Sequence, residues 1–204
     1  MVQSLTRLKE TASQTAGPYV HIGLTPNYCD IGGVYPDDLG TRMVNDKTKG
    51  ERVTYKMRII DGTGSVIRDA LIEIWQADAD GLYNSPSEPR GKADPNFTGW
   101  GRQASDPETG VFTFEAVKPG RVPFTDGRLQ APHVSLWIVA RGINLGLQTR
   151  MYFGDEAEAN AADPVLTRLE HQNRVATLIA PRTGDTYSFD IYLQGEKETV
   201  FFDV

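Results

Sequence analysis

The chain has 204 residues and a net charge of −6, so it should repel the phosphates of nucleic acids and anionic membranes. Its 39% hydrophobic and 24% charged residues are typical of a globular protein, and no apolar run approaches the roughly 20 residues that span a bilayer. Cys29 is the only cysteine and no apolar leader opens the sequence, so we expect a cytoplasmic protein without an internal disulfide.

The first strand pattern lies at residues 53–59, where apolar and polar residues alternate strictly. This period of two predicts a strand with one buried face. Residues 71–75 are almost continuously apolar, which is typical of a strand that is covered on both faces. Asp-Gly-Thr-Gly at residues 61–64 lies between these two segments, and we expect a hairpin turn there.

The second half of the chain repeats both strand patterns. Residues 134–139 form another almost continuous apolar run, whereas residues 187–191 alternate and residues 147–153 do so less strictly. Helix signals are few. Asp163 followed by Pro164 predicts the start of a short helix, and the acidic, alanine-rich run 155–162 predicts another helical turn.

These patterns together predict one all-β domain. The strands favour an antiparallel β-sandwich over residues 51–204, interrupted by short helical segments. Residues 1–50 lack strong periodicity. We therefore expect them to form an N-terminal arm that packs on the sandwich or on a partner.

The common catalytic motifs are absent: the sequence has no CxxC, HExxH, GxSxG or Gly-rich phosphate loop. The only histidines are His21, His133 and His171. His171 lies in a polar context and is interpreted as solvated, whereas His21 fits a structural or interface position. His133 begins an apolar strand, where a histidine is more often a hydrogen-bonded core residue than a metal ligand.

Several segments, taken together, resemble the intradiol aromatic-ring dioxygenases. The signature segment is Arg-Asp-Ala-Leu-Ile-Glu-Ile-Trp-Gln-Ala-Asp at residues 68–78, followed by Gly-Leu-Tyr at residues 81–83. Further matching segments follow in the family's order at residues 94–97, 99–102, 118–120, 131–133 and 152–153. Residues 13–19, 194–196 and 198–203 are similar to the non-iron subunit of a heteromeric member of this family.

The resemblance implies an antiparallel β-sandwich and a mononuclear non-haem Fe(III), which two tyrosinates and two histidines hold in the catalytic subunit. Fe(III) is a hard ion that prefers anionic oxygen, and a bound cation lowers the pKa of a phenol so that it ligates as phenolate. A catechol chelates such a metal through both oxygens, and O₂ then cleaves the ring between the hydroxylated carbons.

The family's four ligand positions are incomplete in this chain. Tyr83 and His133 match the first tyrosine and the first histidine, but Val122 and Ser135 stand at the second tyrosine and the second histidine. Gln130 stands where the catalytic subunit has an arginine. Valine binds no metal and neutral serine replaces imidazole poorly. We therefore expect no working metal site here, and Fe(III) in a partner subunit.

The resemblance still implies a role for this chain beside that partner's iron. In the family, a Thr-x-Gly-Pro-Tyr segment and an arginine of the non-iron subunit reach into the substrate pocket. They match Thr15, Gly17, Pro18 and Tyr19, and Arg141. Glycine and rigid proline allow close approach to a flat ring, and a guanidinium fork suits the carboxylate of an aromatic dihydroxy acid. On the residues alone, these would be an ordinary turn and a surface arginine.

Two alternatives stay open. The chain is a self-sufficient iron dioxygenase if Tyr83 and His133 bind iron together with other residues, such as a tyrosine outside the family's ligand positions. The iron content of the isolated chain tests this alternative. It is a non-catalytic β-sandwich binding module if the resemblance extends only to the fold. Activity of the chain together with an iron-bearing partner subunit decides the second case. A higher-order assembly of such subunit pairs is expected from the resemblance.

Overall fold

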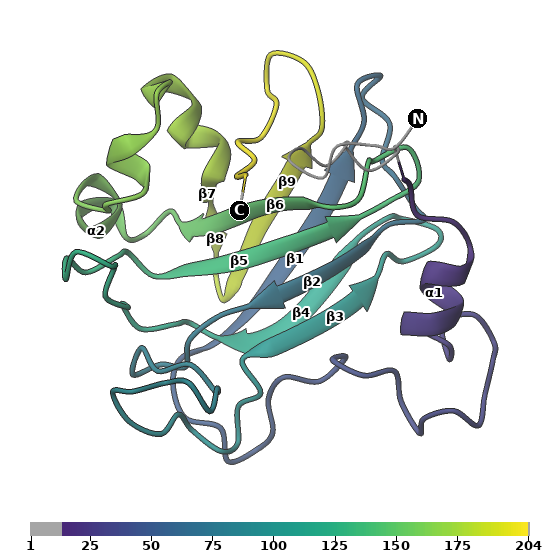
Figure 1. Cartoon of the computed structure of the whole chain (residues 1–204), viewed down its shortest axis with the longest axis horizontal. Coiled ribbons are helices and arrows are strands. Elements are labelled where there is room, and N and C mark those ends of the chain that lie inside the picture. Colours follow the sequence, from purple (N-terminus) through teal and green to yellow (C-terminus); the bar gives the residue numbers. More distant parts are fainter. Residues whose placement is uncertain (1–13, 204) are drawn as a thin grey trace, which may run out of the picture.

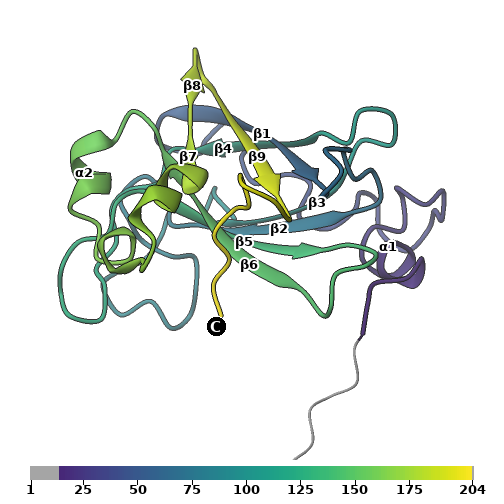
Figure 2. The ribbon, with the colours of Figure 1, turned by 90° about the horizontal axis from the view of Figure 1, so that it is seen from above.

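A computed structural model describes residues 14–203, which form two stacked sheets. The four-stranded sheet has the order β4-β1-β9-β8, and the five-stranded sheet has the order β3-β2-β5-β6-β7. Figure 2 shows the sheets as two layers, with short helical segments beside them. The elements in chain order (Figure 1) are α1 (Tyr19–Leu24), β1 (Arg52–Ile60), β2 (Leu71–Trp75), β3 (Trp100–Ala104), β4 (Phe112–Val117), β5 (His133–Val139), β6 (Leu147–Phe153), α2 (Ala157–Ala161), η1 (Leu166–Arg168), η2 (Gln172–Leu178), β7 (Ile179–Ala180), β8 (Arg182–Thr183) and β9 (Thr186–Tyr192).

The predicted β-sandwich is confirmed, and each of the five strand segments expected from the sequence is a strand: β1, β2, β5, β6 and β9. Most neighbouring strands are antiparallel. The pairs β1–β9 and β6–β7 are parallel, so both sheets are mixed. β1 and β9 are distant in the sequence, and this separation provides the long crossover that a parallel pair requires.

The turn at residues 61–64 forms, but it does not join hairpin partners. The Gly64 N–H donates to the Asp61 carbonyl at 3.0 Å, and Ile60 and Val66 form an isolated antiparallel bridge. β1 and β2, however, lie in different sheets. Both edges of β1 are already occupied by β4 and β9, so the chain crosses to the other layer after the turn. The hairpin prediction was therefore wrong for the strands and correct for the turn.

Two of the short helical segments, η1 and α2, follow the sequence signals, whereas α1 and η2 were not predicted. The Asp163 side chain accepts hydrogen bonds from the backbone N–H groups of Val165 and Leu166 at 2.8 and 2.9 Å, just before and at the first residue of η1. The alanine-rich run contains α2. Among residues 14–203, no helix has the length and apolar character needed to span a membrane.

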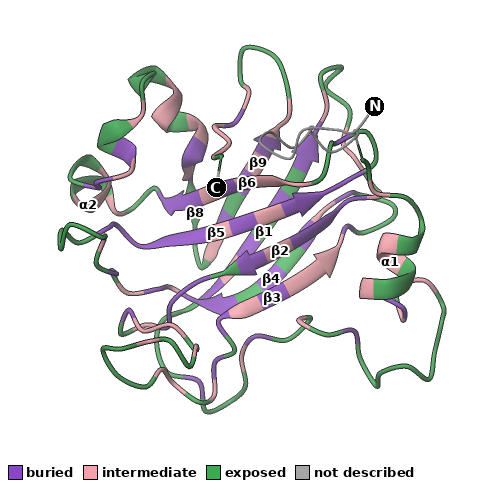
Figure 3. Ribbon diagram, viewed as in Figure 1, coloured by how far each residue is buried: buried purple, intermediate pink, exposed green. Residues whose placement is uncertain are grey.

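The core lies between the sheets and follows the alternation of the strands. In β1, Val53, Tyr55, Met57 and Ile59 are buried, while the residues between them are partly or fully exposed. Figure 3 shows buried positions along the strands, exposed ones along many of the loops, and both exposed and intermediate ones in α1. β5 is the central strand of the five-stranded sheet, and its inward residues Val134, Leu136 and Ile138 are completely buried.

Residues 14–50 run past the outer edge of β3. Met43 is 2% exposed, and its carbonyl accepts a hydrogen bond from the Thr98 N–H at 3.1 Å. The Gly40 carbonyl accepts one from the Arg102 N–H at 2.9 Å. Gly40 has a φ of +86°, and a Cβ there would lie 2.6 Å from the Arg102 nitrogen, so a larger residue is excluded. This contact protects an edge strand from pairing with another chain.

A buried hydrogen bond joins the two sheets and provides a test of the packing. The Tyr55 hydroxyl donates to Gln76 Oε1 at 2.9 Å, and both side chains are almost completely buried. Tyr55→Phe leaves that oxygen unsatisfied and should lower the free energy of unfolding by about 1–3 kcal/mol in urea denaturation. The matched control is Tyr192→Phe in β9, whose side chain is partly exposed. Equal losses in the two variants would contradict this account of the core.

Candidate functional site

The N-terminal arm is fastened to the loop that follows β5. Thr15 and Asn144 form an isolated antiparallel bridge, and the Thr15 hydroxyl accepts a hydrogen bond from the Gly142 N–H at 2.8 Å. The Leu145 N–H donates to the Gln14 carbonyl, also at 2.8 Å. We call this unit, residues 14–18 together with residues 140–145, the arm–loop cluster. It brings together two segments that lie more than a hundred residues apart in the sequence.

The arm–loop cluster borders a cavity of about 500 Å³. Gly17, Pro18 and Arg141 line the cavity, so three of the sequence-predicted binding residues meet there. Thr15 does not line the cavity. Its hydroxyl instead accepts a hydrogen bond from the backbone of the loop that carries Arg141. Tyr19 begins α1, is 82% exposed and also lies outside the lining. The lining of the cavity therefore includes both a rigid Gly-Pro segment and a guanidinium.

Arg141 already has an acidic neighbour in the chain. Its guanidinium forms an ion pair with Asp69, and the two side chains are 74% and 42% exposed. Such exposed pairs contribute little free energy, so a ligand carboxylate can replace Asp69 at small cost. His21 also lines the cavity, with Nε2 3.1 Å from the Asp69 carbonyl and its ring 5.4 Å from that of Tyr28. His21 thus supports the cavity wall structurally.

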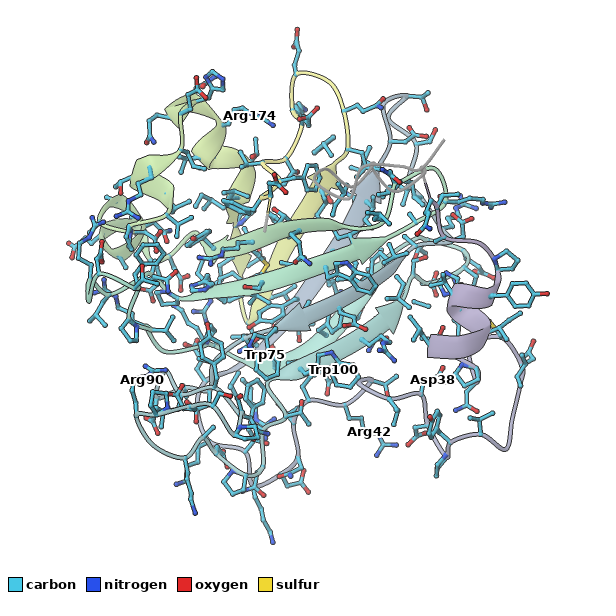
Figure 4. All side chains as sticks on the ribbon, viewed as in Figure 1. Asp38, Arg42, Trp75, Arg90, Trp100 and Arg174 are labelled. Atoms are coloured by element: carbon cyan, nitrogen blue, oxygen red, sulfur yellow. The ribbon has the colours of Figure 1, made fainter. Side chains whose placement is uncertain are left out.

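The four degenerate ligand positions lie elsewhere, at the opposite end of the sheet. Tyr83 and Val122 line a second cavity of about 420 Å³. The Tyr83 ring is parallel to that of Trp75, with centroids 5.9 Å apart. Figure 4 shows Trp75 beside Trp100, with Arg90 in the neighbouring loop. Burial raises the pKa of the Tyr83 phenol, and the charge of Arg150 opposes part of that effect.

His133 and Ser135 lie on the same outward face of β5, as their i, i+2 spacing requires. His133 is 5% exposed, and its Nδ1 is 2.8 Å from the Ala131 carbonyl. Because a carbonyl only accepts, Nδ1 carries the proton. Burial lowers the pKa of His133 to about 4, and the Arg150 cation acts in the same direction. His133 is therefore a neutral, hydrogen-bonded residue at physiological pH.

These donors do not fit the family's Fe(III). Val122 offers no donor atom, Ser135 offers a neutral hydroxyl, and Tyr83 sits where burial raises the pKa of its phenol. Over the described part of the chain, no group of three or more His, Cys, Asp or Glu residues could hold a metal ion. Fe(III) prefers several anionic oxygens, so this set would bind it poorly.

The two sites are separated by the full length of β5. His133 is the first residue of this seven-residue strand, and Arg141 comes two residues after its last. At roughly 3.3 Å per residue, the strand alone spans on the order of 20 Å. Figure 1 shows β5 crossing the molecule, with α1 beyond its carboxyl end. Arg141 and the ligand positions of the same chain therefore cannot hold opposite ends of one benzoate ring.

Sequence reasoning missed three residues of these sites: Asp69, Trp75 and Arg150. Asp69 and Trp75 stand inside the signature segment, but the sequence does not reveal which partners they contact. Arg150 is on the outward face of an alternating strand, which the pattern predicts. Its position opposite Ser135 follows only from the strand register. His171 is exposed, as expected from its polar context.

The ligand substitutions lead to a prediction for the isolated chain. Purified alone, it should contain no stoichiometric iron and show no tyrosinate-to-Fe(III) colour, because Val122 and Ser135 replace a phenolate and an imidazole. Ser135→His alone should produce no ring cleavage, since Val122 still lacks the phenolate. Metal analysis and oxygen uptake measure both quantities. Stoichiometric iron in the wild-type chain, or turnover by the single variant, would refute the ligand assignment.

Comparisons with known proteins agree on one family. A sequence family described as "Dioxygenase" matches residues 24–195. The chain is 44% identical over 202 residues to the protocatechuate 3,4-dioxygenase alpha chain of Pseudomonas putida, covering 96% of this chain and 97% of that protein. It is 31% identical over 182 residues to the protocatechuate 3,4-dioxygenase beta chain of Burkholderia cepacia, covering 83% and 76% respectively.

A solved structure supports the same fold. The crystal structure of 3-chlorocatechol 1,2-dioxygenase from Rhodococcus opacus 1CP is similar with a TM-score of 0.60 and 21% sequence identity. The superposition covers 79% of this chain and 67% of that one. At this level of identity the likeness concerns the sandwich alone.

Proposed function

The chain belongs to the intradiol ring-cleaving dioxygenase family, and we propose that it is the non-iron α subunit of a protocatechuate 3,4-dioxygenase. In this role it works with an iron-bearing β subunit that holds Fe(III). The reaction of the pair joins 3,4-dihydroxybenzoate and O₂ to give 3-carboxy-cis,cis-muconate. Both oxygen atoms enter the product as the ring opens between the hydroxylated carbons.

The distance between the two sites of this chain is the observation that carries the proposal. The arm–loop cluster provides a carboxylate-binding arginine at one end of β5, and the degenerate ligand positions lie at the other. If Arg141 binds the carboxylate of the substrate, the metal that binds the phenolic oxygens must lie at the same end of β5. A partner subunit docked against the arm–loop cluster would bring that metal, so the active site is shared between two chains.

The proposed division of labour follows from the chemistry of the substrate. The partner's iron holds the two phenolic oxygens, and Arg141 holds the carboxylate at the opposite edge of the ring. Gly17 and Pro18 form the wall beside the ring, since they present backbone and a rigid apolar surface. Thr15 positions Arg141 indirectly, through its hydrogen bond to the Gly142 N–H. Tyr19 is exposed on α1 and is assigned to the contact with the partner.

The alternative roles fit less well. A self-sufficient dioxygenase needs ligands in place of Val122 and Ser135, and among residues 14–203 no group of three or more His, Cys, Asp or Glu residues could hold a metal ion. If the chain were a binding module without catalytic function, its near-full-length sequence identity to a named enzyme subunit would have no explanation. The cytoplasmic location, the extent of the arm over residues 1–50 and the number of subunit pairs stay predictions.

The exposed apolar side chains support a partner contact on the arm. The large hydrophobic residues that remain exposed are concentrated between positions 19 and 39: Tyr19, Ile22, Tyr28, Ile31, Val34, Tyr35 and Leu39. Clustered apolar residues on a surface mark an interaction site more often than single ones do. This stretch adjoins Gly17 and Pro18, so one docked subunit would cover both the apolar residues and the cavity.

The isolated chain should therefore self-associate. Sedimentation velocity should show concentration-dependent oligomers, because the apolar arm surface has no partner to cover it. Val34→Ser, which removes one of these exposed side chains, should reduce the self-association. Leu129→Ser serves as the matched control, since Leu129 is similarly exposed outside the arm. A clean monomer at all concentrations would argue against an interface on the arm.

The carboxylate role of Arg141 is tested in the reconstituted pair with its iron-bearing subunit. A charge-assisted hydrogen bond contributes about 1.5–3 kcal/mol, so Arg141→Ala should lower kcat/KM for protocatechuate roughly 10- to 150-fold. Activity toward catechol, which lacks the carboxylate, should change much less. Arg141→Lys should recover only part of the loss because an ammonium cannot reproduce the planar fork. Iron content should be unchanged in both variants.

Arg42→Ala is the matched control for this experiment. Arg42 lies in the arm (Figure 4), its side chain is 77% exposed, and it pairs with Asp37 as Arg141 pairs with Asp69. It should leave kcat/KM for both substrates unchanged. If Arg141→Ala reduces the activity toward catechol and protocatechuate equally, or reduces neither, Arg141 is structural and the carboxylate is bound elsewhere.

A further inference from the structure

Strand register places a carboxylate directly beside Arg141. β2 and β5 pair antiparallel, with Leu71 opposite Val139. Asp69 lies two residues before Leu71, and Arg141 lies two residues after Val139. Continued past the strand ends, the same register sets Asp69 opposite Arg141, and such residues share one face of a sheet. The ion pair between them therefore follows from the pairing of the two strands.

This ion pair has few competing contacts. Arg141 Nη2 contacts Asp69 Oδ2, and within residues 14–203 neither the carboxylate nor the guanidinium has another hydrogen bond or ion pair. A guanidinium carries five N–H donors, so most of them stay available to a ligand. The backbone of Asp69 is held separately. Its carbonyl lies 3.1 Å from His21 Nε2, which must be the donor because a carbonyl only accepts. The side chain can therefore leave Arg141 while the backbone stays in place.

The permanent charges of the cavity lining consist of this one pair. Among the described residues that line the cavity, Arg141 is the only lysine or arginine and Asp69 the only carboxylate. Burial raises the pKa of the Tyr28 phenol and of the Cys29 thiol, so both are neutral at physiological pH. Carboxylates outside the lining raise one or the other of these pKa values further: Asp30, Asp38 and Asp106. A ligand carboxylate that enters the cavity therefore meets one permanent cation, already paired, in negative surroundings.

We propose that Asp69 is an internal competitor for the carboxylate site, which occupies Arg141 in the empty cavity and is displaced when a substrate carboxylate binds. This inference rests on the proposed function, in which Arg141 binds that carboxylate. One guanidinium neutralises one carboxylate, so a second carboxylate beside it is repelled by the first. Asp69 thus acts through Arg141 and lowers the affinity for every carboxylated ligand. Catechol leaves the ion pair closed, so its binding does not depend on Asp69.

The test uses the reconstituted pair with its iron-bearing subunit and the variant Asp69→Asn, which removes the charge and keeps the shape. Exposed ion pairs are weak, so the KM for protocatechuate should fall by about two- to fivefold while kcat stays unchanged. The KM for catechol should not change. Asp69→Glu keeps a carboxylate within reach of Arg141 and should leave the KM for protocatechuate near the wild-type value. A merely structural role of Asp69 would move the constants of both substrates.

Binding without turnover gives a second readout. 4-Hydroxybenzoate carries the carboxylate and one phenolic oxygen, whereas phenol lacks the carboxylate. Titrations followed by the visible absorption of the iron-bearing pair measure the Kd of each compound. Asp69→Asn should tighten the binding of 4-hydroxybenzoate about two- to fivefold and leave that of phenol unchanged. These Kd values depend neither on ring cleavage nor on product release.

Asp190→Asn is the matched control. Asp190 in β9 pairs with Arg58 on the other sheet, and its side chain is 33% exposed, against 42% for Asp69. This variant should leave all of these constants unchanged. The dependence on Arg141 is tested by adding Asp69→Asn to Arg141→Ala. The gain for protocatechuate should then disappear, because no guanidinium remains for which the two carboxylates compete.

Each outcome decides the proposal. A raised KM for protocatechuate in Asp69→Asn would overturn it, because Asp69 would then orient Arg141 for the substrate. An equal effect on both substrates, no effect on either, or a gain that persists beside Arg141→Ala would overturn it as well. If Arg141→Ala alone does not distinguish protocatechuate from catechol, the proposed carboxylate site is wrong and this inference falls with it. If Arg141→Ala distinguishes them and Asp69→Asn does not, only the competition is refuted.

Discussion

The extended backbone of β5 is the constraint on which both sites of the chain depend. It is the central strand of the five-stranded sheet and cannot be shortened or bent without disrupting pairs on both sides. Its first residue carries a degenerate ligand position, and its far end leads into Arg141. A strand of this length separates the two sites by more than a small aromatic acid can bridge. The proposed carboxylate-binding role of Arg141 at one end therefore calls for a metal supplied by another chain.

The alternation of β5 also explains how residues that cannot bind a metal fit at the family's ligand positions without disturbing the fold. Val134, Leu136 and Ile138 face the core and are completely buried, so the sandwich depends on them. The outward residues His133, Ser135 and Trp137 lie on the face of the sheet that points away from this core. A serine opposite an arginine is therefore compatible with the same packing that a histidine would have.

The strands and the family positions were predictable from the sequence because both depend on local patterns. The period of two in β1 and β9 indicates that one face of each strand is buried. The residues next to Tyr83 in the signature segment are enough to match it to the family's first tyrosine. The crossover after residue 64 was not predictable, since it depends on which edges of β1 are already paired. Two contacts depend on strand register and tertiary packing: that of Thr15 with the loop after β5, and that of Arg150 with Gln130. Such contacts are set by the whole fold.

The central claim is that this chain completes an active site whose iron belongs to its partner, and one diffraction experiment tests it directly. Anomalous scattering at the iron edge, from crystals of the assembled subunit pair with bound protocatechuate, locates every iron atom relative to this chain. The account predicts one iron per pair, beside Gly17 and Pro18, with the substrate carboxylate on Arg141. An iron peak between Tyr83 and His133 of this chain, or a substrate bound away from the arm–loop cluster, would contradict it.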